Sequence, residues 1–376
     1  MQSPGLIVTI LSFLLVIGPL IFVHELGHYY VGRWFGVKAE AFSIGFGREI
    51  FGWTDKRGTR WKVGWLPLGG YVRFKGDMNP ASQPTDEWLS LPAEERAQTF
   101  QSKKLWQRFL IVAAGPVTNF LAAILLFIGI FATVGYPTSP AIVTGIVAGA
   151  PADRAGIVPG DRIVEIGGRE IRNFVELQDY VKLRPATPVT LTLLRDGATR
   201  EVSLVTGATM ASDPFGNQAR IGTIGVQSRA IEVAQLPWHE LPGRAVKQTV
   251  DTVRDMVLTL GQLILGDRSV KELGGPLKIA QISGQSVSLG WLPFFWLMAV
   301  ISINLGFINL LPIPMLDGGH LLFYTIEGIR RKPIRPEAQE WAFRTGLAAL
   351  LALMIFVTFN DLASFGLWSR LGGLIG

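Results

Sequence analysis

The segment His24-Glu25-Leu26-Gly27-His28 holds the residue types of a metal-dependent hydrolase. On a helix, side chains four positions apart lie on one face, so His24 and His28 can offer imidazole nitrogens to one metal ion. Zinc suits two imidazoles with an open position for water, and Glu25 beside it is the general base of the HExxH pattern. The alternative is two helical histidines hydrogen-bonded elsewhere. The segment closes an apolar run, where ionisable groups are costly to bury, and this favours the metal site.

A later stretch, Asn309–His320, supplies a candidate third ligand. Pro312 and Pro314 interrupt an apolar run, and unwound backbone is tolerated in a membrane only where it lines a cavity or packs in protein. Asp317 follows directly, and two histidines with one carboxylate leave a coordination position open for water. His320 is chemically an equally good ligand, and spacing alone leaves both open.

The composition predicts a polytopic membrane protein. The chain has 376 residues, of which 49% are hydrophobic and 17% charged, and its mean hydropathy is +0.34. Three uncharged runs are long enough to cross about 30 Å of hydrocarbon, and a shorter fourth run is lengthened by interfacial flanks. These candidate spans are Leu6–Val23, Phe109–Val134, Trp291–Leu316 and Thr345–Asn360.

The distribution of basic residues predicts the orientation. The loop from Arg33 to Arg108 carries 13 Lys and Arg and the loop from Arg330 to Arg344 carries five. Loops rich in Lys and Arg stay in the cytosol, so both termini and the long segment 136–290 are expected outside it. The net charge of +6 is spread along the chain, which argues against a nucleic-acid partner. The chain has no cysteine, which excludes disulfides and thiolate ligands.

Two further regions flank the candidate site. Ala41–Phe74 alternates in short runs separated by Asp55–Gly58 and Leu66–Gly70, a pattern typical of β-hairpins. We expect either a plain cytosolic sheet, or a sheet that dips into the interface and pairs with an extended substrate. In the second span, Pro116 loosens the helix, and Asn119 is a polar group at membrane depth that needs a partner. The alternative to a functional role for Asn119 is ordinary helix–helix packing.

The segment Tyr136–Val226 reads as a soluble insert of short strands. With the turn-rich run Pro159–Gly168 and a helical stretch Phe174–Leu183, it resembles a PDZ domain. Ile221–Val226 is similar to the glycine-hydrophobic strand that holds a peptide C-terminus through backbone donors. A domain serving only as a spacer or size filter is the alternative. Between residues 236 and 288 we expect amphipathic helices on the outer membrane face.

Together the two motifs, four spans and inserted domain resemble the site-2 protease family of intramembrane zinc metalloproteases. The resemblance covers nearly the whole chain and is strongest to bacterial members that regulate sigma-E. It implies that His24, His28 and Asp317 ligate zinc, that Glu25 is the base, and that Ala41–Phe74 is a membrane-associated β-loop. It also implies a set of substrate-site residues, namely Asn304, Asn309, Pro312 and Pro314. Well-known relatives carry two PDZ domains, whereas residues 136–228 accommodate one.

The resulting prediction is an α-helical polytopic membrane protein with four transmembrane helices, a β-loop and an inserted β-rich PDZ domain. Its expected parts are 1–106, with the first span and β-loop; 107–135, the second span; 136–228, the PDZ domain; 229–290, amphipathic; and 291–376, the last two spans. Expected partners are the lipid bilayer, single-span substrates such as an anti-sigma factor or remnant signal peptides, and peptide C-termini at the PDZ domain. The expected location is the bacterial inner membrane. An inactive membrane scaffold and a metal transporter are the rivals, and few intramembrane ionisable residues line a transport path.

Overall fold

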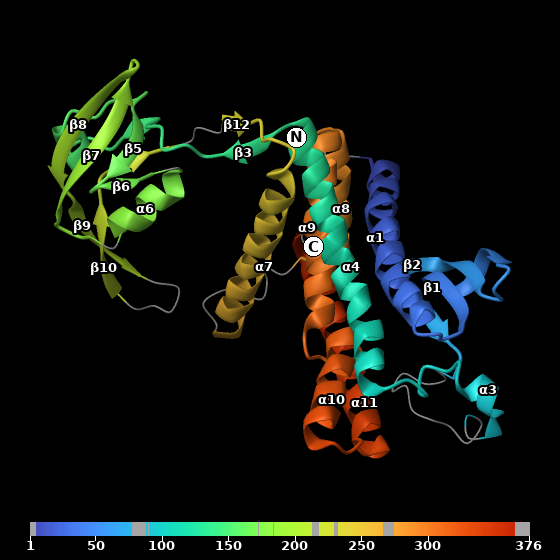
Figure 1. The fold of residues 1–376 in the computed structure, drawn as a ribbon. Helices are drawn as coiled ribbons and strands as arrows, with labels where there is room; N and C mark the ends of the chain where they lie inside the picture. Colours follow the sequence, from blue (N-terminus) through green and yellow to red (C-terminus); the bar gives the residue numbers. More distant parts are fainter. Residues whose placement is uncertain are drawn as a thin grey trace, which may run out of the picture. The chain divides into compact units, whose positions relative to one another are not determined.

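The computed structural model describes residues 5–76, 88, 90–171, 173–182, 184–212, 218–228, 232–265 and 274–364 (Figure 1). These residues form two compact units, each described by itself below. The helical unit comprises residues 5–129, 242–257 and 274–364, and the β-rich unit comprises residues 130–241 and 258–265. The helical unit carries the candidate metal ligands.

Four helices in the described residues are long and apolar enough to cross a membrane. Their bounds are α1 Leu6–Trp34, α4 Leu105–Thr133, α9 Trp291–Leu310 and α11 Pro336–Ser364. All four predicted spans are therefore helical. The third helix ends six residues earlier than the predicted span, where Leu311–Leu316 leaves the helix, and the fourth extends further at both ends. Shorter helices complete the chain: α3 Ala93–Arg96, α5 Pro151–Arg154, α6 Phe174–Lys182, α7 Leu241–Leu265, α8 Pro276–Ser288 and α10 Asp317–Arg330.

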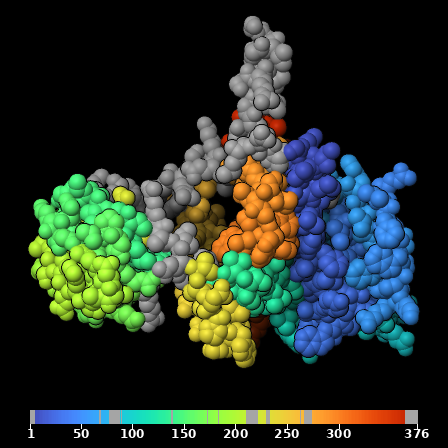
Figure 2. Space-filling view, turned by 90° about the horizontal axis from the view of Figure 1, so that it is seen from above, coloured from blue at the N-terminus to red at the C-terminus, as the bar shows by residue number. Residues whose placement is uncertain are grey.

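Within the helical unit, α1 is packed on two sides. Val16 and Leu20 of α1 contact Phe294 and Met298 of α9 in one buried cluster. On its other side α1 contacts the β-sheet of the same unit, so that in Figure 2 the first helix lies between α8 and α9 and the lighter blue sheet. This packing fixes the end of α1 that carries the two histidines.

Helix α8 is held by the last helix. The carboxylate of Asp361 on α11 accepts hydrogen bonds at 3.0 Å from the backbone N–H groups of Gly275 and Lys278, which would otherwise lack intrahelical partners. Asp361 is buried, and α8 packs against α1 and α9. The expected helical character of this part of residues 236–288 is confirmed.

The sheet of the helical unit consists of β1 Ala39–Thr54 and β2 Arg60–Phe74, which pair antiparallel around the predicted turn at Asp55–Gly58. Phe42 lies opposite both Trp61 and Val72, so each strand bends back on itself. Glycines with positive φ permit the bends, among them Gly45, Gly47 and Gly69. The expected break at Leu66–Gly70 is therefore wrong, since β2 runs through it as a bent strand rather than a turn. Within the described residues, the segment from Gly70 to Phe74 pairs with β1 on one edge only.

The β-rich unit is built around a four-stranded sheet of order β6-β5-β7-β8. Three further two-stranded pairings, β9 with β10, β4 with β11 and β3 with β12, surround it. The core contains Ile163, Leu177, Leu191 and Leu193, which places α6 against the sheet. The strands are β3 Tyr136–Thr138, β4 Gly145–Ile146, β5 Arg162–Ile166, β6 Arg169–Glu170, β7 Pro188–Arg195, β8 Ala198–Val205, β9 Gly207–Ser212, β10 Gln218–Thr223, β11 Val226–Gln227 and β12 Glu232–Ala234.

A buried ion pair fastens the turn that precedes β5. Arg195 donates from Nε and Nη2 to the two carboxylate oxygens of Asp161, at 2.6 and 2.7 Å. Asp161 is fully buried and also accepts from the Val158 backbone N–H at 2.9 Å. The hydrogen bonds from Arg195 hold the pKa of the Asp161 carboxyl below its usual range, although burial opposes the shift.

Because the folded-state pKa of Asp161 is lowered, its stabilising contribution is complete above the unfolded pKa of about 3.9 and is lost as the pH falls through the lower folded value. We expect Asp161→Asn to lower the free energy of unfolding of this unit by about 2 kcal/mol at pH 7. The difference from wild type should shrink below about pH 4. Hydrogen exchange of the β5 and β7 amides in the full-length protein, corrected for intrinsic rates, measures this difference in the free energy of unfolding. An equal difference at pH 3 and pH 7 would contradict this assignment.

Candidate metal centre

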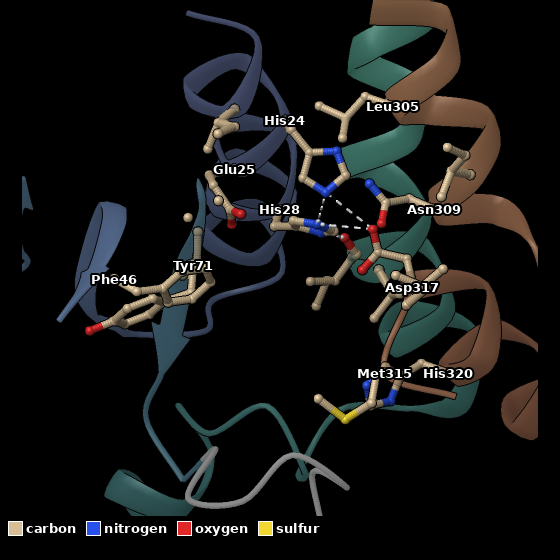
Figure 3. A pocket seen from close by; sticks show the side chains of 18 of the residues that line it. His24, Glu25, His28, Phe46, Tyr71, Leu305, Asn309, Met315, Asp317 and His320 are labelled. Atoms are coloured by element: carbon tan, nitrogen blue, oxygen red, sulfur yellow. Dashed lines mark hydrogen bonds and ion pairs between the residues drawn. The ribbon is translucent and has the colours of Figure 1, made fainter. Parts of the chain in front are cut away.

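The two histidines of α1 point toward one carboxylate. His24 and His28 lie one helical turn apart, and their Nε2 atoms are separated by 3.3 Å. Asp317 brings its Oδ2 atom to 3.2 Å from Nε2 of His24 and 3.5 Å from Nε2 of His28 (Figure 3). The structure therefore brings together three of the predicted site residues from elements far apart in the sequence.

The local sequence explains how Asp317 reaches this place. The segment with Pro312 and Pro314 leaves the helix after α9, and Met315 adopts a positive φ of 82°, a strained conformation for a side chain of this size. The chain then re-enters a helix at Asp317. A Cβ added at Gly318 would lie 2.2 Å from the Leu311 carbonyl oxygen, so the two glycines after Asp317 allow α10 to fold back closely over the unwound segment.

These three ligand atoms fit a zinc ion. Tetrahedral ligands about 2.0–2.1 Å from zinc are separated from one another by about 3.3 Å, which is close to the three separations observed. Oδ2 of Asp317 is buried and makes no hydrogen bond of acceptable geometry within the described residues. A buried carboxylate oxygen facing two imidazole nitrogens, with no donor to satisfy it, is the arrangement that a bound cation completes.

The far nitrogen of His28 fixes its tautomer. Nδ1 lies 2.9 Å from the backbone carbonyl oxygen of Ile111 on α4. A carbonyl only accepts, so Nδ1 carries the proton and donates it, and Nε2 of the neutral ring keeps its lone pair toward His24 and Asp317. Pro116 lacks the N–H that would bond the carbonyl of the residue after Ile111, which loosens α4 at this point.

The far nitrogen of His24 meets the side-chain amide of Asn119, 3.0 Å away on α4. As drawn, the amide nitrogen faces Nδ1 and the amide oxygen is a buried acceptor without a partner. The two amide atoms are exchanged by a half-turn of the side chain, and hydrogen-bond chemistry decides between them. A His24 that ligates metal through Nε2 must carry its proton on Nδ1, and then the Asn119 oxygen accepts it. Ser302 on α9 donates to the Asn119 backbone oxygen at 2.8 Å and holds this residue in place.

We therefore expect Asn119→Leu, which keeps the volume but removes the acceptor, to weaken zinc binding by about 10- to 100-fold. Asn119→Asp restores an acceptor and should recover most of the affinity. Competition for zinc against a chelator of known affinity measures both variants in detergent. Wild-type affinity in Asn119→Leu would show that Asn119 only packs between helices.

Close backbone contacts bring α4 to the histidines. A Cβ added at Gly115 would lie 2.2 Å from Nε2 of His28, and one added at Gly27 would lie 2.4 Å from the Ala114 carbonyl oxygen. Both positions therefore require glycine. Thr118 also donates from Oγ1 to the Val23 carbonyl oxygen at 3.1 Å, so α1 and α4 touch along the whole motif.

Glu25 lies on the side of the site that faces the sheet. Its side chain is 8% exposed, and it shares the wall of one cavity with Val72 on β2. A Cβ added at Gly70 would lie 3.0 Å from Cγ of Glu25. Glu25 is not among the three residues whose ligand atoms converge on one point.

A cavity of about 630 Å³ connects these groups. Its wall includes the two histidines, Glu25 and Asp317, the end of β2 that pairs with β1 on one edge only, and residues of α9, α10 and α11. Both apolar and polar groups line it, and it is wide enough for a peptide segment. The site therefore has a sheet edge on one side and the converging ligands on the other.

The other predicted residues lie at different distances from this cavity. Asn309 is part of its wall and lies beside Asp317 in Figure 3. Among the described residues that form the wall, neither Asn304 nor the two prolines appears: Asn304 lies on α9, and Pro312 and Pro314 shape the unwound segment. His320 lines the cavity, but its ring packs 4.8 Å from Phe343 and its nitrogens are outside the group of three ligand atoms.

Sequence reasoning missed the groups that orient the ligands. It identified Asn119 as a polar residue in need of a partner but not His24 as that partner, and it did not identify the Ile111 carbonyl. The one available signal was the coincidence of Gly115, Pro116 and Asn119 in an otherwise apolar span.

The chain is similar to known proteins over almost its full length. A model of Peptidase family M50 matches residues 12–353. A protein of Agrobacterium fabrum, named "Putative zinc metalloprotease Atu1380", is 44% identical over 363 residues, which cover 94% of this chain and 96% of the relative. "Metalloprotease MmpA" of Caulobacter vibrioides is 35% identical over 400 residues, covering 98% and 99%.

Among solved structures, the PDZ domain of an SdrC-like protein from Listeria innocua matches 26% of this chain at 22% identity. The TM-score is 0.20, too low to support a conclusion about the fold.

Proposed function

The chain belongs to peptidase family M50 and is a zinc metalloprotease, and we propose that it hydrolyses a peptide bond in or near the transmembrane segment of single-span membrane proteins. The observation that carries this proposal is the position of the ligands. His24, His28 and Asp317 converge beside helices that are long and apolar enough to span a bilayer. A metal centre built on such helices acts on peptide bonds at membrane depth.

The proposed roles follow from the geometry. His24, His28 and Asp317 would hold zinc, and the bound ion would supply Lewis-acid polarisation of the scissile carbonyl and a water molecule of lowered pKa. Glu25, one residue from His24 and outside the ligand group, takes the proton from water and returns it to the leaving amide nitrogen. Asn309, which is part of the cavity wall, donates a hydrogen bond to the substrate backbone in this proposal.

The sheet edge gives the substrate its extended form. A helical substrate hides its carbonyls in hydrogen bonds, so it must unwind before water can attack. The segment from Gly70 to Phe74 lines the cavity and has a free edge, which can pair with an extended peptide. Pairing replaces part of the backbone hydrogen bonding that the substrate loses. We therefore also propose that Ala41–Phe74 acts as a β-loop that binds the extended substrate.

In the β-rich unit, we propose that residues 136–228 form a PDZ domain. A cavity of about 240 Å³ lies between α6 and the segment Ile221–Val226, which was predicted to hold a peptide C-terminus. Its wall includes Leu177, Val181 and Lys182 of α6, so an apolar side chain and a carboxylate have complementary partners there. A size filter that admits only substrates shortened by a first cut is the alternative role.

For the biological context, we propose the bacterial inner membrane, with both termini and residues 136–228 outside the cytosol, since the basic loops favour a cytosolic position. An anti-sigma factor of an envelope-stress response is the favoured substrate, and remnant signal peptides are the second. In either case the substrate is a single span whose helix must open.

The test is cleavage of a tagged single-span substrate by purified protein in detergent. A substrate with Gly and Pro in its span should be cut faster than the same span filled with Leu and Ala, because helix-weak residues lower the cost of unwinding. Replacing Val72 by Pro, which removes the amide and distorts the edge, should slow cleavage of the helical substrate more than that of the unwound one. Equal rates for all spans would contradict cleavage of an unwound substrate.

A further inference from the structure

We propose that a pocket at the end of α1 binds the phosphate of an anionic ligand, the group that a phospholipid headgroup carries. The pocket has a volume of about 480 Å³ and is separate from the metal centre. It lies between the last turn of α1, the start of β1 and the turn between the two strands. Its wall is formed by Arg33, Gly36, Val37, Lys38, Arg57 and Gln98.

Positive charge dominates this wall. Three of its six residues are cations, and it contains no acidic side chain. Within the described residues, Arg33, Lys38 and Arg57 form no ion pair with a carboxylate. Lys103 adds a fourth cation at the rim, since its Nζ lies 3.8 Å from a Cβ position built on Gly36.

The neighbouring carboxylates already have other partners. Glu40 pairs with Arg73 at 3.3 Å, Glu49 with Arg60 and Glu95 with Lys75, the last two at 2.5 Å. Asp55 accepts hydrogen bonds from the Trp61 side chain at 3.0 Å and from the turn amides. Asp55 also interacts electrostatically with Arg33, and Glu95 with Lys38, but neither carboxylate forms an ion pair with a pocket cation, so the pocket keeps an excess of positive charge.

An excess of positive charge is costly where the cations are partly shielded from water. Arg33 and Lys38 are half-buried, and like charges held together in a partly desolvated pocket repel one another. A phosphate group removes this cost, because it accepts several charge-assisted hydrogen bonds at once and Arg matches its oxygens in bidentate fashion.

The location favours a lipid as the source of the phosphate. The 29 residues of α1 span about 43 Å, which equals the thickness of a bilayer with its headgroup layers, about 40–45 Å. Arg33, in the last turn, therefore lies at headgroup depth. Three exposed aromatic side chains near this end suit the same layer, namely Tyr30, Trp34 and Trp106, which are 61%, 82% and 54% exposed.

The alternative role for basic residues at a helix end is to orient a membrane protein without binding any particular ligand. The two roles differ in what three neutral substitutions do. A selective site loses its ligand when its own cations are removed and keeps it when three other exposed cations are removed. An orienting charge pattern responds to both sets alike.

The experiment uses full-length protein exchanged into nanodiscs of phosphatidylcholine with 10% phosphatidylglycerol, on the order of the anionic content at which basic patches respond. Native mass spectrometry then counts the phosphatidylglycerol that stays bound. The test variant is Arg33→Gln, Lys38→Gln and Arg57→Gln combined. Its control is Arg48→Gln, Arg330→Gln and Lys332→Gln combined, which removes equal charge from exposed positions. Zinc content verifies that both variants fold.

We expect wild type and control to retain phosphatidylglycerol over phosphatidylcholine, and the test variant to lose this preference by about a hundredfold. An equal loss in both triple variants, or none in either, overturns the proposal. Inorganic phosphate is added in a second arm, in nanodiscs of phosphatidylcholine alone. Phosphate that binds there as tightly as the lipid, and only when the three cations are present, identifies the pocket as a site for free phosphate instead.

Discussion

Glu25→Gln is expected to abolish peptide cleavage while the protein keeps its zinc. The substitution preserves the size of the side chain, but an amide cannot take a proton from water. Loss of general-base catalysis lowers the rate by about 10²- to 10⁴-fold. Because the Glu25 carboxylate is not among the three converging ligand atoms, the zinc affinity should stay within about threefold of wild type.

The measurement combines zinc content with cleavage of a tagged single-span substrate. Glu49→Gln is the matched control, because Glu49 is an exposed carboxylate of the same sheet that pairs with Arg60. The control should cleave as wild type does. Cleavage that persists in Glu25→Gln would contradict the role of Glu25 as general base. Loss of zinc in the same variant would indicate that Glu25 is a zinc ligand.

The second large effect, on both zinc content and cleavage, is expected for Asp317→Ala. It removes one of three ligand atoms, leaving the two imidazoles with an incomplete zinc site, so both zinc content and cleavage should be lost. We expect the zinc affinity to fall by more than about a hundredfold, the upper end of what removal of a supporting residue causes. The substitution also removes the buried carboxylate oxygen that has no donor, so the fold itself should tolerate the change.

His320→Ala distinguishes the two candidates for the third ligand. His320 is three residues from Asp317 but packs beside Phe343, so its removal should leave the zinc content unchanged. Titration of His320→Ala and Asp317→Ala with a chelator measures the zinc affinity of each variant. Zinc retained in Asp317→Ala but lost in His320→Ala would transfer the ligand role to His320.

The features that could be predicted from the sequence depend on local spacing. His24 and His28 share a helical face because four residues make about one turn, and the apolar runs revealed all four helices that are long and apolar enough to cross a membrane. The prolines before Asp317 correctly indicated that the chain unwinds there, although the predicted span ran on to Leu316 and the helix ends at Leu310. Each of these conclusions needs only a window of about twenty residues.

The features that were missed depend on contacts between distant segments. Asn119 meets His24 across 95 residues, the Ile111 carbonyl meets His28 across 83, and Ser302 supports Asn119 across 183. No local period encodes such pairs. The bend in β2 was also missed, because a run such as Leu66–Gly70 is equally compatible with a turn and with a bulged strand, and the choice is made by pairing with β1.

The distance in sequence between the ligands has a consequence for biosynthesis. His24 and His28 are made with the first of the four long apolar helices, whereas Asp317 follows only after the third, nearly three hundred residues later. A ribosome working at about 5–20 residues per second needs at least about fifteen seconds to supply it. Until then the chain holds two histidines and a glutamate but no complete metal centre. With the proposed ligands, a nascent or prematurely terminated chain is thus expected to be proteolytically silent, and activity is expected only when nearly all of the protein has been made.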